Sequence, residues 1–312
     1  MLAGGEGTRL HSLTRDDAGN AVPKQFCSLS GRESLLAQTL SRARAIVDRE
    51  RVTAIVSAHH TQHWRSPLQE LPAENIFVQP DNRGTAIGIL LPLLAIVARD
   101  PAARVLILPS DHYVADEAAM EIALRTALAL IVCQPRGIAL LGLDPDEPDP
   151  ELGYIVAEPR AGLAFQGVHR FVEKPTLAAA RQLCDEGALW NSFILACRAE
   201  SLIDLYMSRC PEIVALLRAV DPRDHKALAD AYGRMPQLDF SRQIATGAED
   251  RLAVVRVPRC GWSDLGTPER LAQTLVRYPK LITRNSELEC EWPPEELINL
   301  AERLVERYPD YL

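Results

Sequence analysis

The sequence has no apolar run long enough to cross a membrane. Its longest apolar stretch, Ile87 to Val97, contains Pro92 and falls short of the roughly 18 to 20 residues that span a bilayer. The segment Met1 to Gly5 also lacks the basic stretch and apolar run of a secretory signal. We therefore expect a cytoplasmic protein with no membrane partner.

Basic charge is also scarce in this chain. There are 34 Lys and Arg residues against 42 Asp and Glu residues, which gives a formal net charge of −8. Such a chain lacks the basic surface that holds a nucleic-acid backbone, so we expect no nucleic-acid partner. Any region that binds a phosphate must then be locally basic.

Cysteines are few and widely scattered. The seven residues form no CxxC pair, and their odd number and spacing favour neither a disulfide framework nor a zinc site. A reducing compartment fits this pattern best. The residues are Cys27, Cys133, Cys184, Cys197, Cys210, Cys260 and Cys290.

The order of apolar patterns indicates the fold class. Hydrophobic residues make up 47% of the chain, which is typical of a folded globular protein. Short β-rich segments alternate with helical patterns such as Glu33 to Val47, which carries an apolar stripe at helical spacing. This alternation predicts an α/β fold, with a Rossmann-like mixed, mostly parallel sheet flanked by helices. The expected strands are Val52 to Ser57, Ile76 to Gln79, Arg104 to Pro109 and Gly137 to Leu143.

Extended segments return after residue 150, and helical patterns then lead to a late strand. We interpret residues 1–278 as one domain with two halves and residues 279–312 as a helical extension. In the extension Pro293 and Pro294 suit a helix start. We expect this helix to dock on its own domain, with homodimer formation as the alternative. The later strands are Gly153 to Ala157, Val168 to Lys174, Asn191 to Cys197 and Leu252 to Val257.

Three glycines, Gly4, Gly5 and Gly7, lie close together near the N-terminus. Glycines let backbone N–H groups face an anion without Cβ obstruction, and Arg9 and Lys24 add positive charge. The pattern lacks both the third glycine of the dinucleotide-binding motif and the Gly-Lys-Ser/Thr ending of the P-loop. A plain turn explains the glycines but not the two basic residues. We interpret the segment as a phosphate-binding loop.

The run GGEGTRL, followed by PKQF, resembles the signature of sugar-1-phosphate nucleotidylyltransferases. PKQF is similar to the mannose-1-phosphate guanylyltransferase branch in particular. The resemblance implies the nucleotide-diphospho-sugar transferase fold, a loop that holds a nucleoside triphosphate, and a phosphate-neutralising role for Lys24. Members of the family carry several apolar residues before the glycines, whereas three residues precede Gly4 here. We therefore expect either that the chain starts further upstream or that its first strand is shortened.

The run QPDNRGTA, from Gln79 to Ala86, precedes a helical pattern from Ile87 to Arg99. A helix N-terminus favours a phosphate or a polar base edge, although an ordinary capped loop also explains the run. The run resembles the base-recognition segment of the family and favours the guanylyl branch. The resemblance therefore implies a nucleotide-binding set of Gly4, Gly5, Gly7, Thr8, Arg9, Gln79, Asn82, Arg83, Gly84 and Thr85.

Two aspartates are candidate metal ligands. Asp111 follows the predicted strand Val105 to Leu108, where ligands bind in open α/β sheets, although it is equally explained as a turn cap. The resemblance implies that Asp111 and Asp264, the latter in GWSDLGT, hold Mg²⁺. Carboxylate oxygens are the hard ligands that this ion prefers. With Arg9 and Lys24, the two aspartates form the implied catalytic set.

Three patches between these aspartates resemble the sugar-phosphate side of the family. They are GYI beginning at Gly153, VEKP with Glu173 and Lys174, and WNS with Asn191. Glu173 and Asn191 have groups that can bind hydroxyls, and Lys174 can pair with the sugar phosphate. Gly153 would let a sugar ring approach the backbone. Each patch has an ordinary structural explanation, but their order along the chain favours the functional one.

Two positions depart from the pattern of the family. Phe193 follows Trp-Asn-Ser where glycine is usual, and the segment Asp239 to Arg242 only partly resembles the guanylyl branch. Phe193 either narrows the sugar pocket or packs beneath it. We assign Asp239 no role.

The histidines His59, His60 and His63 have two interpretations. His59 and His63 would share a face of a helix and so could bind a metal. A solvated helix that begins after Ser57 is the explanation we favour.

The ordered motifs predict an enzyme that transfers a guanylyl group from GTP to mannose 1-phosphate. The products would be GDP-mannose and pyrophosphate, with Mg²⁺ as cofactor. Two alternatives stay open. One is a related pyrophosphorylase that uses UTP or dTTP with glucose 1-phosphate, and the other is a catalytically weak regulatory relative that binds nucleotide sugars.

Overall fold

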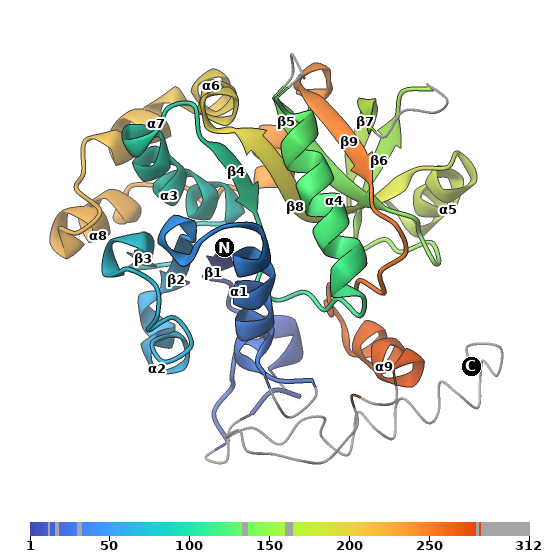
Figure 1. Ribbon diagram of the computed structural model, residues 1–312, viewed down its shortest axis with the longest axis horizontal. Coiled ribbons are helices and arrows are strands. Elements are labelled where there is room, and N and C mark those ends of the chain that lie inside the picture. The colour runs from blue at the N-terminus through green and yellow to red at the C-terminus, as the bar shows by residue number, and fades with distance from the viewer. Residues whose placement is uncertain are drawn as a thin grey trace.

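A computed structural model describes most of the chain before residue 279. The described residues are 1–11, 13–15, 19–29, 33–132, 137–159, 165–278 and 281. The helical extension predicted for residues 279–312 lies outside them, apart from Leu281. Figure 1 shows the arrangement of the elements.

The N-terminal half is built on three parallel strands in the order β1-β2-β3. They are β1 (Leu2–Ala3), β2 (Ala54–Ser57) and β3 (Ile76–Gln79). The first strand has two residues, and every residue of β2 is buried. The Leu2 N–H donates to the Leu108 carbonyl at 2.9 Å. Leu2 also forms a parallel bridge with Pro109, so this sheet continues toward β4 (Arg104–Ile107).

The second sheet has six strands in the order β4-β8-β5-β9-β7-β6. Beyond β4 these are β5 (Ile138–Leu143), β6 (Gly153–Ala157), β7 (Phe165–Glu173), β8 (Leu189–Arg198) and β9 (Leu252–Arg256). Within it β5 and β9 pair in parallel, whereas its other paired strands are antiparallel. The predicted mixed α/β sheet is confirmed, with a smaller share of parallel pairing than the alternating sequence indicated.

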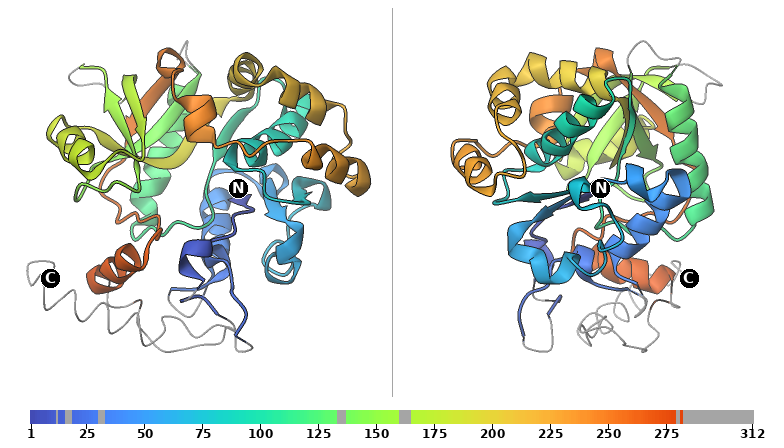
Figure 2. Two further views of the ribbon diagram at one scale, coloured as in Figure 1. Left: turned by 180° about the vertical axis from the view of Figure 1, so that it is seen from behind. Right: turned by 60° about the vertical axis from the view of Figure 1, so that its left-hand side comes forward.

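Helices cover both faces of the strands. Helices α1 (Leu35–Ile46) and α4 (Glu117–Leu130) pack together on the face turned to the viewer in Figure 1, and α3 (Thr85–Arg99) and α6 (Ala199–Arg209) lie on the other face (Figure 2, right). The caps that sequence pattern favours begin α1 and α4, because Ser34 Oγ and Asp116 Oδ1 each accept a first-turn N–H. The remaining helices are α2 (Thr61–Trp64), α5 (Leu177–Asp185), α7 (Pro211–Arg218), α8 (His225–Gly233) and α9 (Pro268–Arg277).

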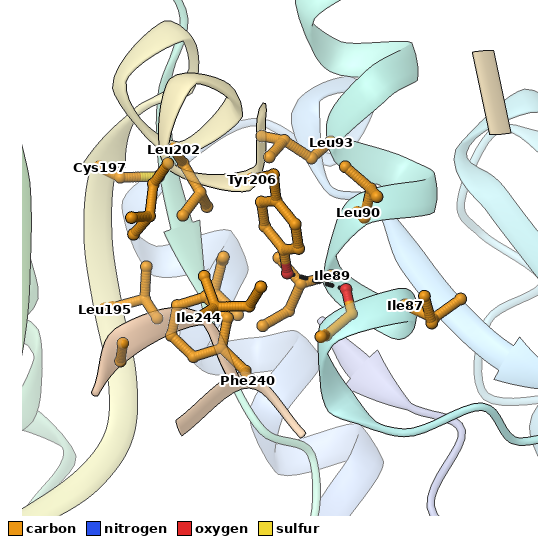
Figure 3. Packing of buried hydrophobic residues seen from close by; sticks show 14 of the residues in the cluster. Ile87, Ile89, Leu90, Leu93, Leu195, Cys197, Leu202, Tyr206, Phe240 and Ile244 are labelled. Atoms are coloured by element: carbon orange, nitrogen blue, oxygen red, sulfur yellow. Dashed lines mark hydrogen bonds between the residues drawn. The ribbon is translucent and has the colours of Figure 1, made fainter. Parts of the chain in front are cut away.

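A large apolar cluster fixes α3 against α6. Tyr206 is fully buried there among leucine and isoleucine side chains, with Phe240 beside it (Figure 3). Its hydroxyl donates to the Ala86 carbonyl at 2.8 Å, the dashed line in Figure 3. Because Ala86 belongs to the first turn of α3, this bond holds the start of the helix in place.

No helix in the described part of the chain combines the length and the apolar character that crossing a bilayer requires.

Candidate active site

A cavity of about 520 Å³ lies where the parallel strands end. Gly4 follows β1, Gln79 ends β3 and Asp111 comes shortly after β4, so the cavity lies at the carboxyl edge of the sheet, where open α/β folds bind ligands. Residues from both halves of the chain line it. The sequence-predicted residues among them are Gly4, Gly5, Arg9, Lys24, Gln79, Asn82, Gly84, Thr85, Asp111, Gly153, Glu173, Lys174, Asn191 and Asp264.

Two of the predicted residues, Gly7 and Arg83, do not line this cavity, and the side chain of Thr8 lies outside what the structure describes. Gly7 turns the chain with a φ of 63°, and a Cβ there would lie 3.2 Å from the Lys24 backbone nitrogen. Thr8 is described only by its backbone, in a 3₁₀ turn from Thr8 to Leu10. Arg83 points to Asp81, with 3.1 Å between Nη2 and Oδ2. The structure therefore gives Gly7 and Arg83 positions that support the loops rather than face a ligand.

The glycine loop is held open by two glutamines. Gln25 Nε2 donates to the Gly5 carbonyl at 2.8 Å, and Gln79 Nε2 donates to the Gly4 carbonyl at 3.3 Å. A Cβ on Gly4 would lie 2.3 Å from Gln79 Nε2, so only glycine permits this approach. Gly5, in contrast, has open space where a side chain would be. The loop therefore presents bare backbone to the cavity.

Two of the predicted phosphate-binding cations share one carboxylate. Glu151 Oε2 lies 3.1 Å from Arg9 Nη1 and 3.7 Å from Lys174 Nζ. The three side chains are about half exposed, so each is free to re-pair when an anion enters. Arg9 comes from the glycine loop and Lys174 from the end of β7. The carboxylate thus lies between basic groups of the two halves of the site.

Lys24 joins the two candidate metal-binding loops. Its ammonium lies 3.1 Å from Asp111 Oδ2 and also donates to the backbone carbonyl of Asp264. Burial opposes ionisation of Asp111, but the charge of Lys24 and its hydrogen bond to the carboxylate outweigh burial, so the pKa of Asp111 lies below the ordinary value. Asp111 is therefore a carboxylate at neutral pH. The site already attracts one cation to this oxygen.

The neighbour of Asp111 is a neutral histidine. His112 is 8% exposed, and burial lowers its pKa to about 4 despite the nearby carboxylates. Its Nδ1 accepts a hydrogen bond from Trp262 Nε1 at 3.3 Å, and its Nε2 lies 3.5 Å from Asp111 Oδ1. The uncharged ring adds no positive charge that would repel a metal ion.

The start of α3 is closed by a distant segment of the chain. The Ala86 N–H donates to the Leu238 carbonyl at 3.0 Å, and Thr85 Oγ1 accepts from the Phe240 N–H at 2.8 Å. A Cβ on Gly84 would lie 2.3 Å from the Leu238 oxygen. The first N–H groups of this helix are therefore partly used within the protein. The Gly84 N–H is also used, because Asn82 Oδ1 accepts it at 2.9 Å.

The sugar-side residues meet across neighbouring strands. Gly153 of β6 pairs with Glu173 of β7, and a Cβ on Gly153 would lie 2.7 Å from Glu173 Oε2 and 3.4 Å from Asn191 Cβ. Burial and the nearby charge of Asp239 raise the pKa of Glu173. The three predicted residues therefore border one space, and Gly153 leaves it open.

Strained backbone gathers at this cavity. Among the described residues, the non-glycine residues with positive φ are Lys174 at 47°, Phe193 at 58° and Leu265 at 49°. The first two line the cavity and the third follows Asp264. The left-handed turn at Phe193 coincides with a shift in the β5–β8 register, and its ring packs on Phe240 at 6.0 Å between centroids. Such strain persists where surrounding structure holds it, often at functional sites.

Several residues that line the cavity were not predicted from the sequence. Glu151 could have been suspected because it lies two residues before Gly153, but its partner Arg9 is 142 positions away in the sequence. Gln237, Leu238 and Gln243 also line the cavity, on either side of the segment Asp239 to Arg242 that only partly resembles the guanylyl branch. A π-helical turn from Phe240 to Ala245 overlaps this segment, and this form of helix is frequent at functional sites. No sequence pattern marked that turn.

The histidine cluster lies beneath the glycine loop. His60 is buried, with Nε2 3.3 Å from Glu6 Oε2, while His59 is exposed. The Phe26 ring stacks on His63 at 5.3 Å and meets His60 edge-on at 5.8 Å. Within the described ranges, no group of three or more His, Cys, Asp or Glu residues is placed to hold a metal. The solvated helix expected here is exposed only in part.

The arrangement can bind a polyanion next to a polyol. One side of the cavity offers bare backbone, Arg9 and Lys24. The other side offers Glu173, Lys174 and Asn191. Asp111 and Asp264 supply hard carboxylate oxygens beside the same cavity. Two carboxylates suit Mg²⁺ when substrate phosphates complete its coordination.

Comparison with known proteins agrees with this geometry. The sequence model of the nucleotidyl transferase family matches residues 1–280. The mannose-1-phosphate guanylyltransferase of Escherichia coli is 32% identical over 281 residues, which cover 86% of this chain and 57% of that protein. The alginate biosynthesis protein AlgA of Pseudomonas aeruginosa is 33% identical over 277 residues, 86% of this chain and 56% of that protein. The chain thus spans a little over half the length of these curated relatives.

A solved structure is similar over most of the fold. The protein named as mannose-1-phosphate geranyltransferase from Thermus thermophilus matches with a TM-score of 0.75 and 30% identity. The match covers 88% of this chain and 77% of that one. It includes both halves of the cavity, because no single half reaches that share of the chain.

Proposed function

Because the chain belongs to the nucleotidyl transferase family, we propose that it transfers a nucleotidyl group to a sugar 1-phosphate. The specific reaction we propose is the formation of GDP-mannose and pyrophosphate from GTP and mannose 1-phosphate. The observation that carries the proposal is the cavity in which phosphate-binding and hydroxyl-binding residues meet beside Asp111 and Asp264.

The chemistry is a displacement at phosphorus. A phosphate oxygen of mannose 1-phosphate attacks the α-phosphorus of GTP, and the bond from that phosphorus to the β-phosphate oxygen breaks to release pyrophosphate. No side-chain nucleophile is needed. The protein has to align the two phosphates and offset their negative charge, which are the main devices of phosphoryl-type transfer.

The chain divides these tasks between its two halves. The glycine loop and Arg9 bind the triphosphate, and Lys24 leaves Asp111 to meet charge that develops at the α-phosphate. Lys174 binds the sugar phosphate, while Glu173 and Asn191 bind hydroxyls. Glu151 releases Arg9 and Lys174 as the two phosphates replace it.

Mg²⁺ is the proposed cofactor. Asp111 and Asp264 would hold it, and the ion would offset phosphate charge during transfer. The donor set fits this ion because both carboxylates border the cavity and Lys24 already occupies the cation position beside Asp111.

The choice of guanine and mannose rests on the relatives. The names of the Escherichia coli protein and of the Thermus thermophilus protein both refer to mannose 1-phosphate, and the former is a guanylyltransferase. The loop from Gln79 to Thr85 and the residues Glu173 and Asn191 supply the polar groups for that recognition.

The test is a matrix of nucleotides and sugars. Purified full-length chain is incubated with Mg²⁺, with each of GTP, UTP, dTTP, ATP and CTP, and with mannose 1-phosphate or glucose 1-phosphate, and pyrophosphate release is measured. Highest kcat/KM for GTP with mannose 1-phosphate supports the specific proposal. Turnover of another pair alone rejects the specificity but retains nucleotidyl transfer, and binding of GDP-mannose without any turnover rejects the enzyme.

A further inference from the structure

A largely buried arginine of α9 lies between two aspartates. The Arg270 side chain is 10% exposed, its Nη1 contacts Asp149 Oδ2 at 2.5 Å, and its Nε lies 2.9 Å from Asp264 Oδ1. Asp149 belongs to the loop between β5 and β6, and Asp264 to the loop before α9. One guanidinium therefore joins two loops that border the active-site cavity.

The Asp264 carboxylate is held through one of its oxygens. Oδ1 accepts the Gly266 N–H at 3.0 Å and faces Arg270 Nε. A Cβ on Gly266 would lie 2.4 Å from both Arg270 Nη2 and Asp264 Oδ2, so only glycine leaves room for the pair. Within the described part of the chain both contacts use Oδ1.

Asp149 anchors the arginine from the other side. Its backbone N–H donates to Tyr154 Oη at 2.8 Å, and that hydroxyl donates back to the Asp149 carbonyl at 3.1 Å. Trp190 Nε1 donates to the same hydroxyl at 3.1 Å. Tyr154 is fully buried, so Asp149 is attached to the sheet rather than to a free loop. Arg270 therefore has a fixed support.

The charges of Asp149 and Asp264 determine how Arg270 affects a cation bound nearby. An arginine alone beside Asp264 would offset the negative charge that attracts a metal ion. Asp149 brings a second negative charge to the same guanidinium, so the pair of Arg270 and Asp149 is formally neutral. The row of Asp149, Arg270 and Asp264 therefore keeps a net charge of one negative unit while the orientation of Asp264 is fixed.

The helix that carries Arg270 is itself firmly packed. Leu271 and Leu275 of α9 are fully buried in an apolar cluster with Leu10 of the glycine-loop segment and Leu265 of the metal-binding loop. Thr267 Oγ1 accepts the Arg270 N–H and begins the helix. The backbone of Arg270 is thus held in place by packing against the glycine-loop segment and the metal-binding loop.

We infer that Arg270 is a positioning residue that fixes the orientation of the Asp264 carboxylate for the catalytic cation. The inference rests on the proposed function in taking that cation to be divalent and bound by Asp264. The contact between Arg270 Nε and Asp264 Oδ1 is an ion pair without hydrogen-bond geometry.

The test measures binding of Mn²⁺ alone to the full chain by water proton relaxation, without substrates. Arg270→Met should raise the Kd for Mn²⁺ about tenfold, a loss comparable to that of other residues that orient metal ligands. Arg270→Lys should raise it less, because a single ammonium contacts one carboxylate well but not two. Asp264→Asn provides the reference for complete loss of this ligand.

Two further variants separate orientation from charge and from folding. Arg277→Met is the matched control, because Arg277 also lies on α9 and pairs with the same loop, at 2.6 Å from Asp146, but about half exposed. It should leave the Kd unchanged. The double variant Asp149→Asn with Arg270→Met removes one positive and one negative charge, and it should bind Mn²⁺ as weakly as Arg270→Met.

Three results would overturn the inference. They are an unchanged or lower Kd in Arg270→Met, a wild-type Kd in the double variant, and an equal effect of Arg277→Met. If Arg270→Met does not fold, as judged by circular dichroism, a wild-type Kd in Arg270→Lys overturns it as well. Because no turnover is measured, weaker Mn²⁺ binding in a chain that transfers no nucleotide would support the inference while rejecting the proposed function.

Discussion

Replacement of His112 by Gln should remove part of the acid sensitivity of the fold. His112 is 8% exposed, and burial lowers its pKa from the ordinary value of 6.5 to about 4. The unfolded chain therefore takes up a proton at a higher pH than the folded chain does. Stability from the neutral ring is complete above about pH 6.5 and is lost as the pH falls toward 4.

The magnitude follows from the two pKa values. At about pH 5 the unfolded ring is almost fully protonated and the folded ring almost fully neutral, which costs the folded state about 2 kcal/mol relative to pH 7.5. Gln has no charge to gain, and its side-chain oxygen can still accept the Trp262 N–H. The variant should therefore lose about 2 kcal/mol less than the wild type between these pH values.

Urea unfolding followed by tryptophan fluorescence at about pH 5 and pH 7.5 measures the difference directly. Comparing each protein with itself across pH cancels any change in packing that the substitution causes. His59→Gln is the matched control, since His59 is exposed. If wild type and His112→Gln lose the same free energy of unfolding, then His112 is not a buried neutral ring and the reasoning is refuted.

Three further substitutions test other parts of the account. Gly153→Ala places a Cβ 2.7 Å from Glu173 Oε2, and steady-state kinetics should show a KM for the sugar 1-phosphate about tenfold higher with an unchanged nucleotide KM; equal changes in both would contradict this. Tyr206→Phe removes the buried hydrogen bond from the hydroxyl to the Ala86 carbonyl and should lower the free energy of unfolding by about 0.5–1.5 kcal/mol in urea, whereas no loss would count against the bond. Phe193→Gly should increase relative turnover of bulkier sugar 1-phosphates. It should change stability by less than about 1 kcal/mol, because relief of left-handed strain offsets the lost ring packing; an unaltered sugar preference would place the ring outside the sugar pocket.

Local sequence patterns predicted most of the secondary structure that surrounds the site. The strands at Ile76–Gln79 and Gly153–Ala157 are confirmed at both ends, and the helix predicted from Glu33 to Val47 spans Leu35–Ile46. These elements have clear apolar periodicity and local caps, so their neighbours along the chain are enough to specify them. The assignment to the nucleotidyl transferase family is confirmed as well.

Features that depend on distant contacts could not be predicted in this way. The start of α3 was expected to offer its N–H groups to a ligand, but the Leu238 carbonyl takes the Ala86 N–H. Glu151 lies between Arg9 and Lys174 only because β6 and β7 bring the second half of the chain to the glycine loop. Neither contact leaves a local pattern, since each joins residues far apart in sequence.

The direction of strand pairing could also be predicted only in part from the sequence. Alternating strands and helices indicated parallel pairing, which holds for β1, β2 and β3. In the second half β8 pairs antiparallel with β4, β5 and β6. Spacing along the chain does not reveal this insertion of β8 between earlier strands.

We propose that this cavity transfers a nucleotidyl group from GTP to mannose 1-phosphate. The most direct measurement follows GTP labelled at its α-phosphorus, incubated with the full chain, Mg²⁺ and mannose 1-phosphate. We expect the label to move into GDP-mannose. Asp111→Asn and Asp264→Asn should each reduce this transfer by at least about a hundredfold. Label that stays in GTP, or that moves into GMP without any sugar nucleotide, would contradict it.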